Sequence, residues 1–467
     1  MTRRPGYHPS THRGLTFHDA RAAFLAGSDT PRDYLERCLA VIAEREPQVK
    51  AWVTLNEAGA RAAADAATAR YRDGKPLSPV DGMPVGIKDL IETRDMPTQM
   101  GSPMYAGYSS GRDSASVYAL RSGGAVILGK TVTTELGFSH PGPTTNPFDP
   151  ERTPGGSSSG SAAAVGAAMV PVALGSQVVG SVIRPAAFCA NVAIKPTLGA
   201  LNRGERVLLS QSHLGVHGSS LEDIWDVSWH VARVAGGDPG YPGLHGLPEL
   251  APPTRPARLA LVETEGWSHV DADTRHAFER VLDGLRRAGV AIVTRAEHPA
   301  VEAFERAIGD SLALCRDVCG YELRWQLWNW RDKGPGLLSD SMMQRLSMAD
   351  DMRPEDYRAR LDEREEMRRR HAALAPVVDA LVTLSCAGPA PLMVQSSRHL
   401  DSGISHTTGL PAFNAATSAL GSPAITLPML AVGAMPVGVQ LIGQQHADWR
   451  LAGIARWLSS TVEPVAV

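Results

Sequence analysis

The chain has 467 residues, of which 43% are hydrophobic and 20% charged, and its formal net charge at pH 7 is −3. This length allows a large core, and the lack of a basic excess excludes free-standing nucleic-acid binding through positive charge. Its five cysteines, an odd number without a Cys-x-x-Cys pair, indicate neither a disulfide framework nor a zinc site. We therefore expect a globular protein with a small-molecule partner.

The first part of the chain predicts helices and then strands. Apolar residues recur at helical spacing over residues 16–46, where Pro31 suits a helix start, and residues 57–72 form an alanine-rich helical segment. Residues 84–90 and 125–130 have the apolar, β-branched character of buried strands. Strands that alternate with helices predict an α/β architecture.

An uncharged stretch of 31 residues runs from Thr153 to Ile183, bracketed by Arg152 and Arg184. It has too many glycines and serines, and a proline, for a membrane span. Residues 162–174 are too apolar for a flexible linker. The pattern favours a core helix that is entered through a Gly-Gly-Ser turn and left through a second glycine-rich turn, and buried serines here suggest a nucleophile.

After this stretch the sheet is predicted to continue. Ser219 or Ser220 can cap a helix over residues 221–235. A strand at 257–263, a helix near 271–288 and a strand at 290–295 form a β-α-β unit. Further strands are predicted at 378–384, 422–428 and 435–443, and no repeat or linker divides the chain, which favours one domain.

Four motifs together resemble the amidase signature family. They are GMPVGIKD (82–89), GKTVTTELG (129–137), GGSSSGSAAAVGAAMVPVALGSQVVGS (155–181) and MPVGVQLIG (435–443). The motifs occur in the family's order, and the resemblance covers roughly residues 15–460. It implies a large mixed central β-sheet covered by helices on both faces.

The resemblance also implies a domain organisation. Residues 1–467 would form a single amidase signature domain. Within it, residues 1–60 would be an N-terminal helical layer, 61–235 the signature core, and 300–375 a variable helical region that shapes the substrate pocket.

A Ser-Ser-Lys triad follows from the same resemblance, with Lys88 as general base, Ser157 as bridging serine and Ser181 as nucleophile. Only six of the 46 basic residues are lysines, and a lysine can give up a proton that an arginine keeps. Burial would lower the pKa of Lys88. Taken singly, Ser157 could cap a helix, Ser181 could be a turn serine, and Lys88 could pair with Asp89 or Glu92.

The backbone N–H groups of Val178, Val179, Gly180 and Ser181 are expected to form an oxyanion hole. The expected supporting residues are Gly156, Ser158, Gln177 and Arg184, and the family holds its bridging serine by a cis peptide, here Gly156–Ser157. The family usually has aspartate where Gln177 stands, glycine where Val179 stands, and its arginine two residues after the nucleophile rather than three. We therefore expect a neutral contact in place of an Asp-Arg pair, and a narrower pocket beside Val179.

Three tryptophans lie within residues 325–330. The pattern suits the apolar face of a packed helix. The alternative is a wall of the substrate pocket, formed by Trp325 and Trp328, because aromatic side chains supply large contact areas.

The sequence thus predicts an amidohydrolase that cleaves a small amide through a Ser181 acyl-enzyme, without metal or cofactor. Carbamates, ureas and aryl esters are alternative substrates for the same triad. A glutamine-dependent amidotransferase subunit with partner chains is a second alternative, and a non-catalytic binding protein a third. The N-terminus lacks the apolar core of about 7 to 15 residues of a secretory signal, so a cytoplasmic location is expected, and the family suggests a homodimer.

Overall fold

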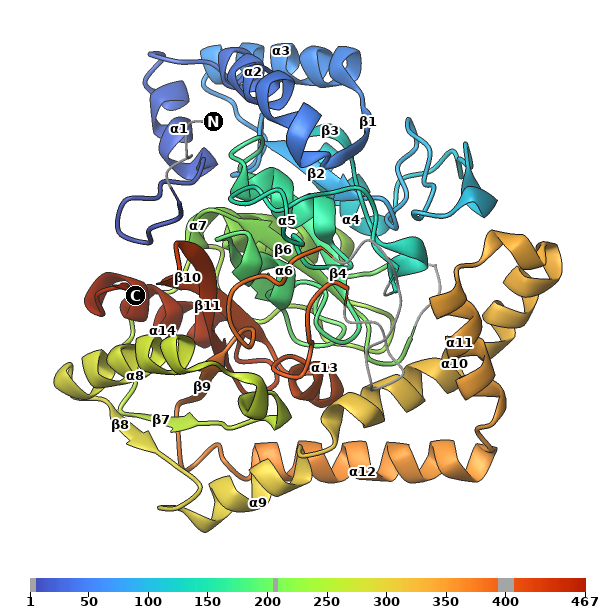
Figure 1. The fold of residues 1–467 in the computed structure, drawn as a ribbon. Helices are drawn as coiled ribbons and strands as arrows, with labels where there is room; N and C mark the ends of the chain where they lie inside the picture. Colours follow the sequence, from blue (N-terminus) through green and yellow to red (C-terminus); the bar gives the residue numbers. More distant parts are fainter. Residues whose placement is uncertain (1–5, 139, 205–208, 394–406) are drawn as a thin grey trace.

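The computed structural model describes residues 6–138, 140–204, 209–393 and 407–467, which form a mixed sheet with helices on both faces (Figure 1). The described strands are β1 (Trp52–Leu55), β2 (Pro84–Lys88), β3 (Val126–Thr131), β4 (Val172–Gln177), β5 (Val192–Lys195), β6 (His213–Gly218), β7 (Arg258–Leu261), β8 (Ala291–Val293), β9 (Ala380–Leu384), β10 (Ala424–Val432), β11 (Met435–Ile442) and β12 (Val465–Ala466). They lie in the order β1-β3-β2-β4-β6-β5-β10-β11-β9-β7-β8, and β12 pairs with β10. The predicted fold class is confirmed.

The sheet combines parallel and antiparallel pairs. β2 pairs in parallel with β3 and with β4, and β7 pairs in parallel with β8 and β9. Between these two groups the neighbours from β4 through β6, β5, β10 and β11 to β9 are all antiparallel. The carboxyl ends of β2, β3 and β4 therefore meet at one edge, where Lys88, Thr131 and Gln177 end their strands.

The helices cover this sheet in two layers. They are α1 (Phe17–Leu25), α2 (Pro31–Val49), α3 (Glu57–Arg72), α4 (Ala115–Ser122), α5 (Ser159–Gly166), α6 (Ile183–Phe188), α7 (Leu221–Ala235), α8 (Ala272–Arg287), α9 (Pro299–Ala307), α10 (Ser311–Lys333), α11 (Asp340–Asp350), α12 (Pro354–Ala372), α13 (Ala415–Leu420) and α14 (Asp448–Thr461). The layer with α4, α7, α8 and α14 packs on one face, and α5, α6 and α13 pack on the other. α10 and α11 extend to one side of the sheet, and α12 lies at the bottom of the view, packed against α9, α10 and α13 (Figure 1).

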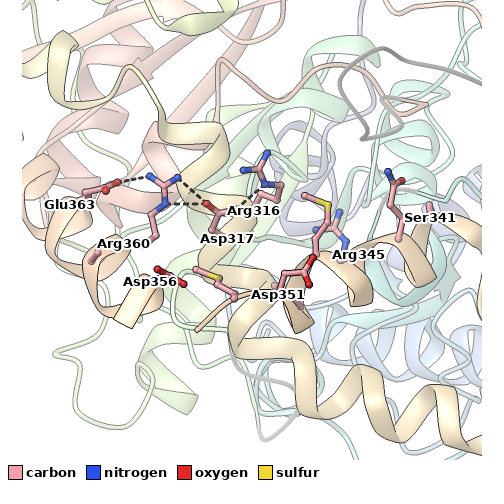
Figure 2. A pocket seen from close by; sticks show the side chains of 14 residues that line it. Arg316, Asp317, Ser341, Arg345, Asp351, Asp356, Arg360 and Glu363 are labelled. Atoms are coloured by element: carbon pink, nitrogen blue, oxygen red, sulfur yellow. Dashed lines mark hydrogen bonds and ion pairs between the residues drawn. The ribbon is translucent and has the colours of Figure 1, made fainter. Parts of the chain in front are cut away.

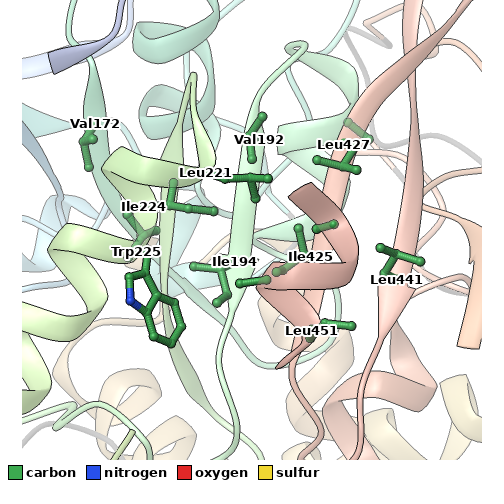
Figure 3. Packing of buried hydrophobic residues seen from close by; sticks show 14 of the residues in the cluster. Val172, Val192, Ile194, Leu221, Ile224, Trp225, Ile425, Leu427, Leu441 and Leu451 are labelled. Carbon is green, nitrogen blue, oxygen red and sulfur yellow. The ribbon is translucent and has the colours of Figure 1, made fainter. Parts of the chain in front are cut away.

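Apolar side chains that alternate along the strands form the core under α7 and α14. Figure 3 shows Trp225 of α7 and Leu451 of α14 beside Ile194 and Ile425 of the sheet. Val85 and Ile87 of β2 belong to the same cluster. Since successive side chains of a strand point to opposite faces, Lys88 of β2 points to the face covered by α5.

Several helix boundaries follow from local capping. α3 and α7 have the predicted bounds, and Ser220 rather than Ser219 caps α7 by accepting the N–H of Asp223. Pro31 occupies the first position of α2, after Thr30, whose side chain accepts the N–H of Asp33. These ends are determined by residues close in sequence, which is why they could be predicted.

The prediction of one core helix over residues 162–174 is wrong in its second half. The helix α5 ends at Gly166, and β4 begins at Val172, so the run contains a helix, a turn with Pro171 and a strand. An apolar run of this length does not distinguish a buried helix from a buried strand. In the described part of the chain, no helix combines the length and apolar character needed to cross a bilayer.

Candidate active site

Lys88 ends β2 between the two strands that flank it, and its side chain is fully buried. Its Nζ donates to Oγ of Ser157 at 2.7 Å, to Oγ of Ser176 at 3.0 Å and to the carbonyl of Ser176 at 3.2 Å. Burial lowers the pKa of Lys88 well below its usual range, because the charged ammonium loses its hydration. Lys88 thus contacts two hydroxyl groups, and its lowered pKa favours the neutral amine form.

Asp89, the residue after Lys88, is not its partner. Its carboxylate lies 3.2 Å from Nζ of Lys130 on the neighbouring strand β3. Burial raises the pKa of Asp89, while the charge of Lys130 opposes this shift. The alternative in which Lys88 pairs with Asp89 is therefore wrong, because consecutive residues at a strand end point in different directions.

The loop before α5 brings Ser157 to Lys88. The peptide bond Gly156–Ser157 is cis, as the family resemblance implies, and Gly155 has φ +83°. A Cβ at Gly156 would lie 2.9 Å from the γ-methyl groups of Thr134 and Thr408, closer than carbon atoms normally approach. The Gly-Gly pair thus lets the loop run close to its neighbours and bury Ser157, which is 4% exposed.

The turn between β4 and α6 carries Ser181, and Gln177 holds this turn. Its Oε1 accepts the N–H groups of Val182 at 2.8 Å and Ile183 at 3.1 Å, and its Nε2 donates to Oγ of Ser418 at 3.1 Å. The contacts of Gln177 are thus with neutral groups, as expected from the sequence. Within the described ranges, the backbone N–H groups of residues 179–181 meet no acceptor.

Arg184 joins the helix after Ser181 to the loop before Ser157. Its Nη2 donates to the carbonyl of Gly156 at 2.7 Å, and its Nε donates to the carbonyl of Thr408 at 2.9 Å. The other predicted supporting residue, Ser158, accepts the N–H of Ser176 at 3.3 Å. These contacts fix the two serine-bearing segments to one another across the sheet edge.

Ser157 and Ser181 line the same small pocket, of about 90 Å³, which we call the serine pocket. Its walls also come from the turn after β4, from α10 and from the segment after residue 406. Other lining residues include Gly137, Phe138, Val178, Val179, Gly180, Arg184, Cys315, Arg316, Cys319 and Arg345. The structure thus brings together all three predicted triad residues, through the hydrogen bond of Lys88 to Ser157 and the pocket that Ser157 and Ser181 share.

A larger cavity of about 570 Å³, the aromatic pocket, meets the serine pocket at Ser157, Phe138 and Val178. Trp325 lines this pocket, whereas Trp328 does not and donates its indole N–H to Asp350 at 2.7 Å. Sequence reasoning missed the other Phe, Tyr and Trp side chains of the wall, which are Tyr105, Tyr108, Phe138 and Trp330. Trp330 belongs to the same tryptophan-rich run. Which tryptophans of this run face the pocket depends on how α10 packs, and the sequence alone does not specify this.

Two buried histidines of β6 lie near this site. His213 lines the aromatic pocket, and burial lowers the pKa of His217 to about 3, with a further contribution from the charge of Lys88. In the part of the chain that the structure describes, the basic side chain that contacts a serine of the pocket is Lys88. Among the same residues, no group of three His, Cys, Asp or Glu side chains is placed to hold a metal ion.

Comparisons with known proteins identify the family of the chain. A family model described as Amidase matches residues 33–451. The chain is 41% identical over 227 residues to a glutamyl-tRNA(Gln) amidotransferase subunit of Chloroflexus aggregans, a match that covers 47% of this chain and 45% of that protein. The matched region thus spans about half the length of this relative.

Two solved structures are similar over almost their whole length. One is a crystal structure of an amidase, with a TM-score of 0.81 and 26% identity, covering 96% of this chain and 100% of the other. The second is the peptide amidase of Stenotrophomonas maltophilia, with a TM-score of 0.73, 26% identity and coverage of 96% and 98%. Together with the family model, these similarities confirm the prediction that the chain is an enzyme of the amidase class.

Proposed function

The chain belongs to the amidase family, and from this premise we propose that it is an amidohydrolase that cleaves the C–N bond of a small amide through an acyl-enzyme on Ser181. The observation that carries the proposal is the 2.7 Å hydrogen bond from Nζ of Lys88 to Oγ of Ser157, at a pocket that Ser157 shares with Ser181. A serine is a weak nucleophile until a base takes its proton. A desolvated lysine is able to be that base at neutral pH.

The proposed reaction has two halves. In the first, Oγ of Ser181 attacks the amide carbon while its proton passes to Ser157, and the proton of Ser157 passes to neutral Lys88. The tetrahedral intermediate collapses, the same relay returns a proton to the departing nitrogen, and ammonia or an amine leaves. In the second half, water attacks the acyl-enzyme by the same proton path and releases the carboxylic acid and Ser181.

The oxyanion hole is proposed to be the turn of residues 178–181. Support comes from the free backbone N–H groups of residues 179–181 within the described ranges and from Gln177, which holds the turn by accepting two later N–H groups. Donors held in place before the reaction stabilise developing negative charge, and one such donor contributes roughly 10²–10³ in rate in well-studied enzymes.

Labelling with a fluorophosphonate tests the nucleophile. Intact-mass measurement should show one adduct on the unmutated chain, and peptide mapping should place it on Ser181. Ser181→Ala should remove the adduct, and Lys88→Ala should slow its formation by at least about 100-fold. Ser161→Ala is the control, because Ser161 belongs to the same serine-rich segment but is fully buried and donates to the carbonyl of Leu174 at 2.9 Å. An adduct on another serine would overturn the proposal.

A glutamine-dependent amidotransferase role is the second candidate, and the similarity to the relative from Chloroflexus aggregans favours it. That reading requires partner chains and glutamine as the nitrogen donor. The two candidates separate when the purified chain alone is given a panel of simple amides, with glutamine, carbamates, ureas and aryl esters in parallel. Turnover of simple amides that exceeds turnover of glutamine would exclude the amidotransferase role. Light scattering of the same preparation tests the expected homodimer.

A further inference from the structure

The two pockets of the candidate active site differ in size and in the serines that line them. The serine pocket has a volume of about 90 Å³ and contains Ser157 and Ser181, whereas the aromatic pocket has a volume of about 570 Å³ and contains Ser157 and Ser176. A water molecule in the liquid occupies about 30 Å³, so the serine pocket has room for few atoms beside the reacting amide. The aromatic pocket has the size of a site for a larger organic ligand.

Both hydroxyl partners of Lys88 line the aromatic pocket. Nζ of Lys88 donates to Oγ of Ser157 at 2.7 Å and to Oγ of Ser176 at 3.0 Å, and Ser181 is absent from the described lining of this pocket. In the proposed reaction Ser157 returns a proton to the departing nitrogen, so this nitrogen has to lie within hydrogen-bond distance of Ser157. The nitrogen side of the amide therefore faces the aromatic pocket.

The acyl side of the amide then faces the part of the serine pocket that the aromatic pocket does not share. Val179, Leu312, Cys315 and Cys319 belong to this part. Burial raises the pKa of Cys315 to about 12 and that of Cys319 well above its usual range, so both thiols are uncharged at neutral pH. The carbonyl of Val179 accepts the hydroxyl of Ser418 at 2.9 Å, which holds this wall in place. A short aliphatic acyl group fits these side chains in size and polarity.

The arginines of the serine pocket have partners within the protein. Arg184 donates to two backbone carbonyls. Arg316, which also lines an outer cavity of about 430 Å³ between α10, α11 and α12, forms an ion pair with Asp317 at 2.8 Å (Figure 2). Cζ of Arg345 lies 4.8 Å from the centre of the Phe138 ring. An uncharged acyl group therefore leaves none of these three arginines without a partner.

The charged side chains in the described lining of the aromatic pocket are paired as well. Nε of Arg112 lies 2.9 Å from the carboxylate of Glu92, and Arg203 forms an ion pair with Asp238. Burial lowers the pKa of His213 well below its usual range, so its imidazole is neutral. A charged ligand group would lose its hydration here without gaining a counter-ion. The aromatic pocket thus favours an uncharged group.

Aromatic side chains from two segments form a connected wall in this pocket. Tyr105 and Tyr108, which follow β2, have their ring centres 5.8 Å apart at nearly a right angle. Trp330 of α10 is 3% exposed and donates its indole N–H to the hydroxyl of Tyr105 at 2.8 Å. Trp325 of the same helix is 57% exposed and reaches the solvent. A ligand ring gains edge and stacking contacts against such a wall.

We infer that the aromatic pocket binds the amine part of the substrate, which carries a neutral aromatic group, and that the serine pocket binds a short, uncharged acyl group. The inference rests on the proposed amidase function and assigns its substrate class. Ser181 bonds to the acyl carbon as the C–N bond breaks, and the amine leaves with the proton that Ser157 transfers. Water then hydrolyses the ester, which releases a short carboxylic acid and restores the hydroxyl of Ser181.

Reversed amides test this orientation. N-benzylacetamide and the N-methyl amide of phenylacetic acid have the same atoms, but the ring lies on the nitrogen side in the first and on the acyl side in the second. A further pair has naphthyl in place of phenyl. Amine release should give a kcat/KM at least roughly tenfold higher for the acetyl member of one pair, the range that a hydrophobic group contributes in a fitting pocket. A smaller preference in both pairs, or the opposite preference, would overturn the inference.

Variants of the aromatic wall locate the ring. Trp330→Phe should lower kcat/KM for the naphthyl acetyl member roughly two- to tenfold, because contact area is lost. The rate of fluorophosphonate labelling at Ser181 should stay the same, which excludes unfolding as the cause. Trp328→Phe is the matched control, the same substitution on α10 outside the pocket lining. Trp325→Ala, at an exposed position, should act in the same direction as Trp330→Phe, and no effect of either variant would overturn the inference.

Fluorophosphonate labelling also separates this inference from the proposed function. The absence of an adduct on Ser181 would overturn the acyl-enzyme itself. An adduct on Ser181 together with faster hydrolysis of the reversed members would overturn the assignment of the two pockets and leave the proposed nucleophile standing. An adduct without hydrolysis of either member of both pairs would have the same meaning.

Discussion

Lys88 and Lys130 lie on neighbouring strands of one sheet and are equally buried, but Lys130 has a carboxylate among its partners and the printed partners of Lys88 are neutral. Nζ of Lys88 contacts hydroxyl groups of Ser157 and Ser176. Nζ of Lys130 contacts the carboxylate of Asp89 at 3.2 Å and Oγ1 of Thr98 at 2.7 Å.

This difference in partners gives two equally buried lysines different tendencies to keep their proton. A carboxylate partner favours the charged ammonium and opposes the effect of desolvation, whereas hydroxyl groups leave desolvation unopposed. Lys88 is thus suited to proton transfer and Lys130 to a structural ion pair. Exchanging or removing these lysines should separate activity from stability.

The largest effect is expected for Lys88→Met. Loss of the base should reduce kcat by at least about 10⁴-fold, the scale seen when a member of a hydrolase triad is removed. The melting temperature should stay the same or rise, because methionine buries no polar group at this position. Steady-state kinetics and thermal unfolding measure the two quantities. Residual kcat within about tenfold of the unmutated chain would contradict the role of Lys88.

Lys130→Met should act on stability. Removing one partner of a buried ion pair leaves Asp89 without its cation, which costs about 3–5 kcal/mol of unfolding free energy. Adding Asp89→Asn should restore part of this loss, because the uncompensated charge is then gone. Denaturant titration of the single and double variants provides the test, and a greater loss of stability in the double variant would exclude the ion pair as the cause.

A third buried lysine, Lys195 of β5, predicts a pH dependence of stability. It contacts the carbonyl of Ser422, and burial lowers its pKa from 10.5 to about 7, opposed by the charge of Asp448. Between these two pH values the unfolded chain binds the additional proton, so the unfolding free energy rises with pH, by at most about 1.4 kcal/mol per pH unit from this group.

Lys195→Met should therefore flatten the increase in unfolding free energy between about pH 7 and pH 10. Denaturant titrations at several pH values measure the slope. Lys88, whose pKa is also lowered, contributes with the same sign, so some increase should remain in Lys195→Met. A slope that steepens in this variant would contradict the assignment.

The smallest effect is expected at the aromatic pocket. Trp325→Ala should reduce kcat/KM for amides with aromatic groups roughly two- to tenfold, the usual worth of an aromatic contact. Trp328→Ala is the control, because Trp328 lies outside the lining of this pocket. Equal effects of Trp325→Ala and Trp328→Ala across an amide panel would show that the aromatic pocket does not determine substrate specificity.

The sequence by itself determined the family, the α/β class and the residues of the proposed triad. Motif residues such as Lys88 at a strand end and Gly156 in a closely packed loop meet local requirements that leave little choice of residue. The N-terminal ends of α3 and α7 could also be predicted, because the capping side chain and the N–H that it accepts are only three residues apart in the sequence.

Only the tertiary structure decided which groups meet across long distances in the chain. Residues 162–174 divide into helix and strand because β4 pairs with β2 and β6, and those pairings have no trace in the run itself. Asp89 turns from Lys88 to Lys130, and Arg345 reaches a pocket whose serines lie more than 150 residues earlier in the sequence. The physical reason is the same in each case. A buried group is stabilised by whichever partner the packed helices and strands place within contact distance, and the spacing of residues along the chain does not specify that partner.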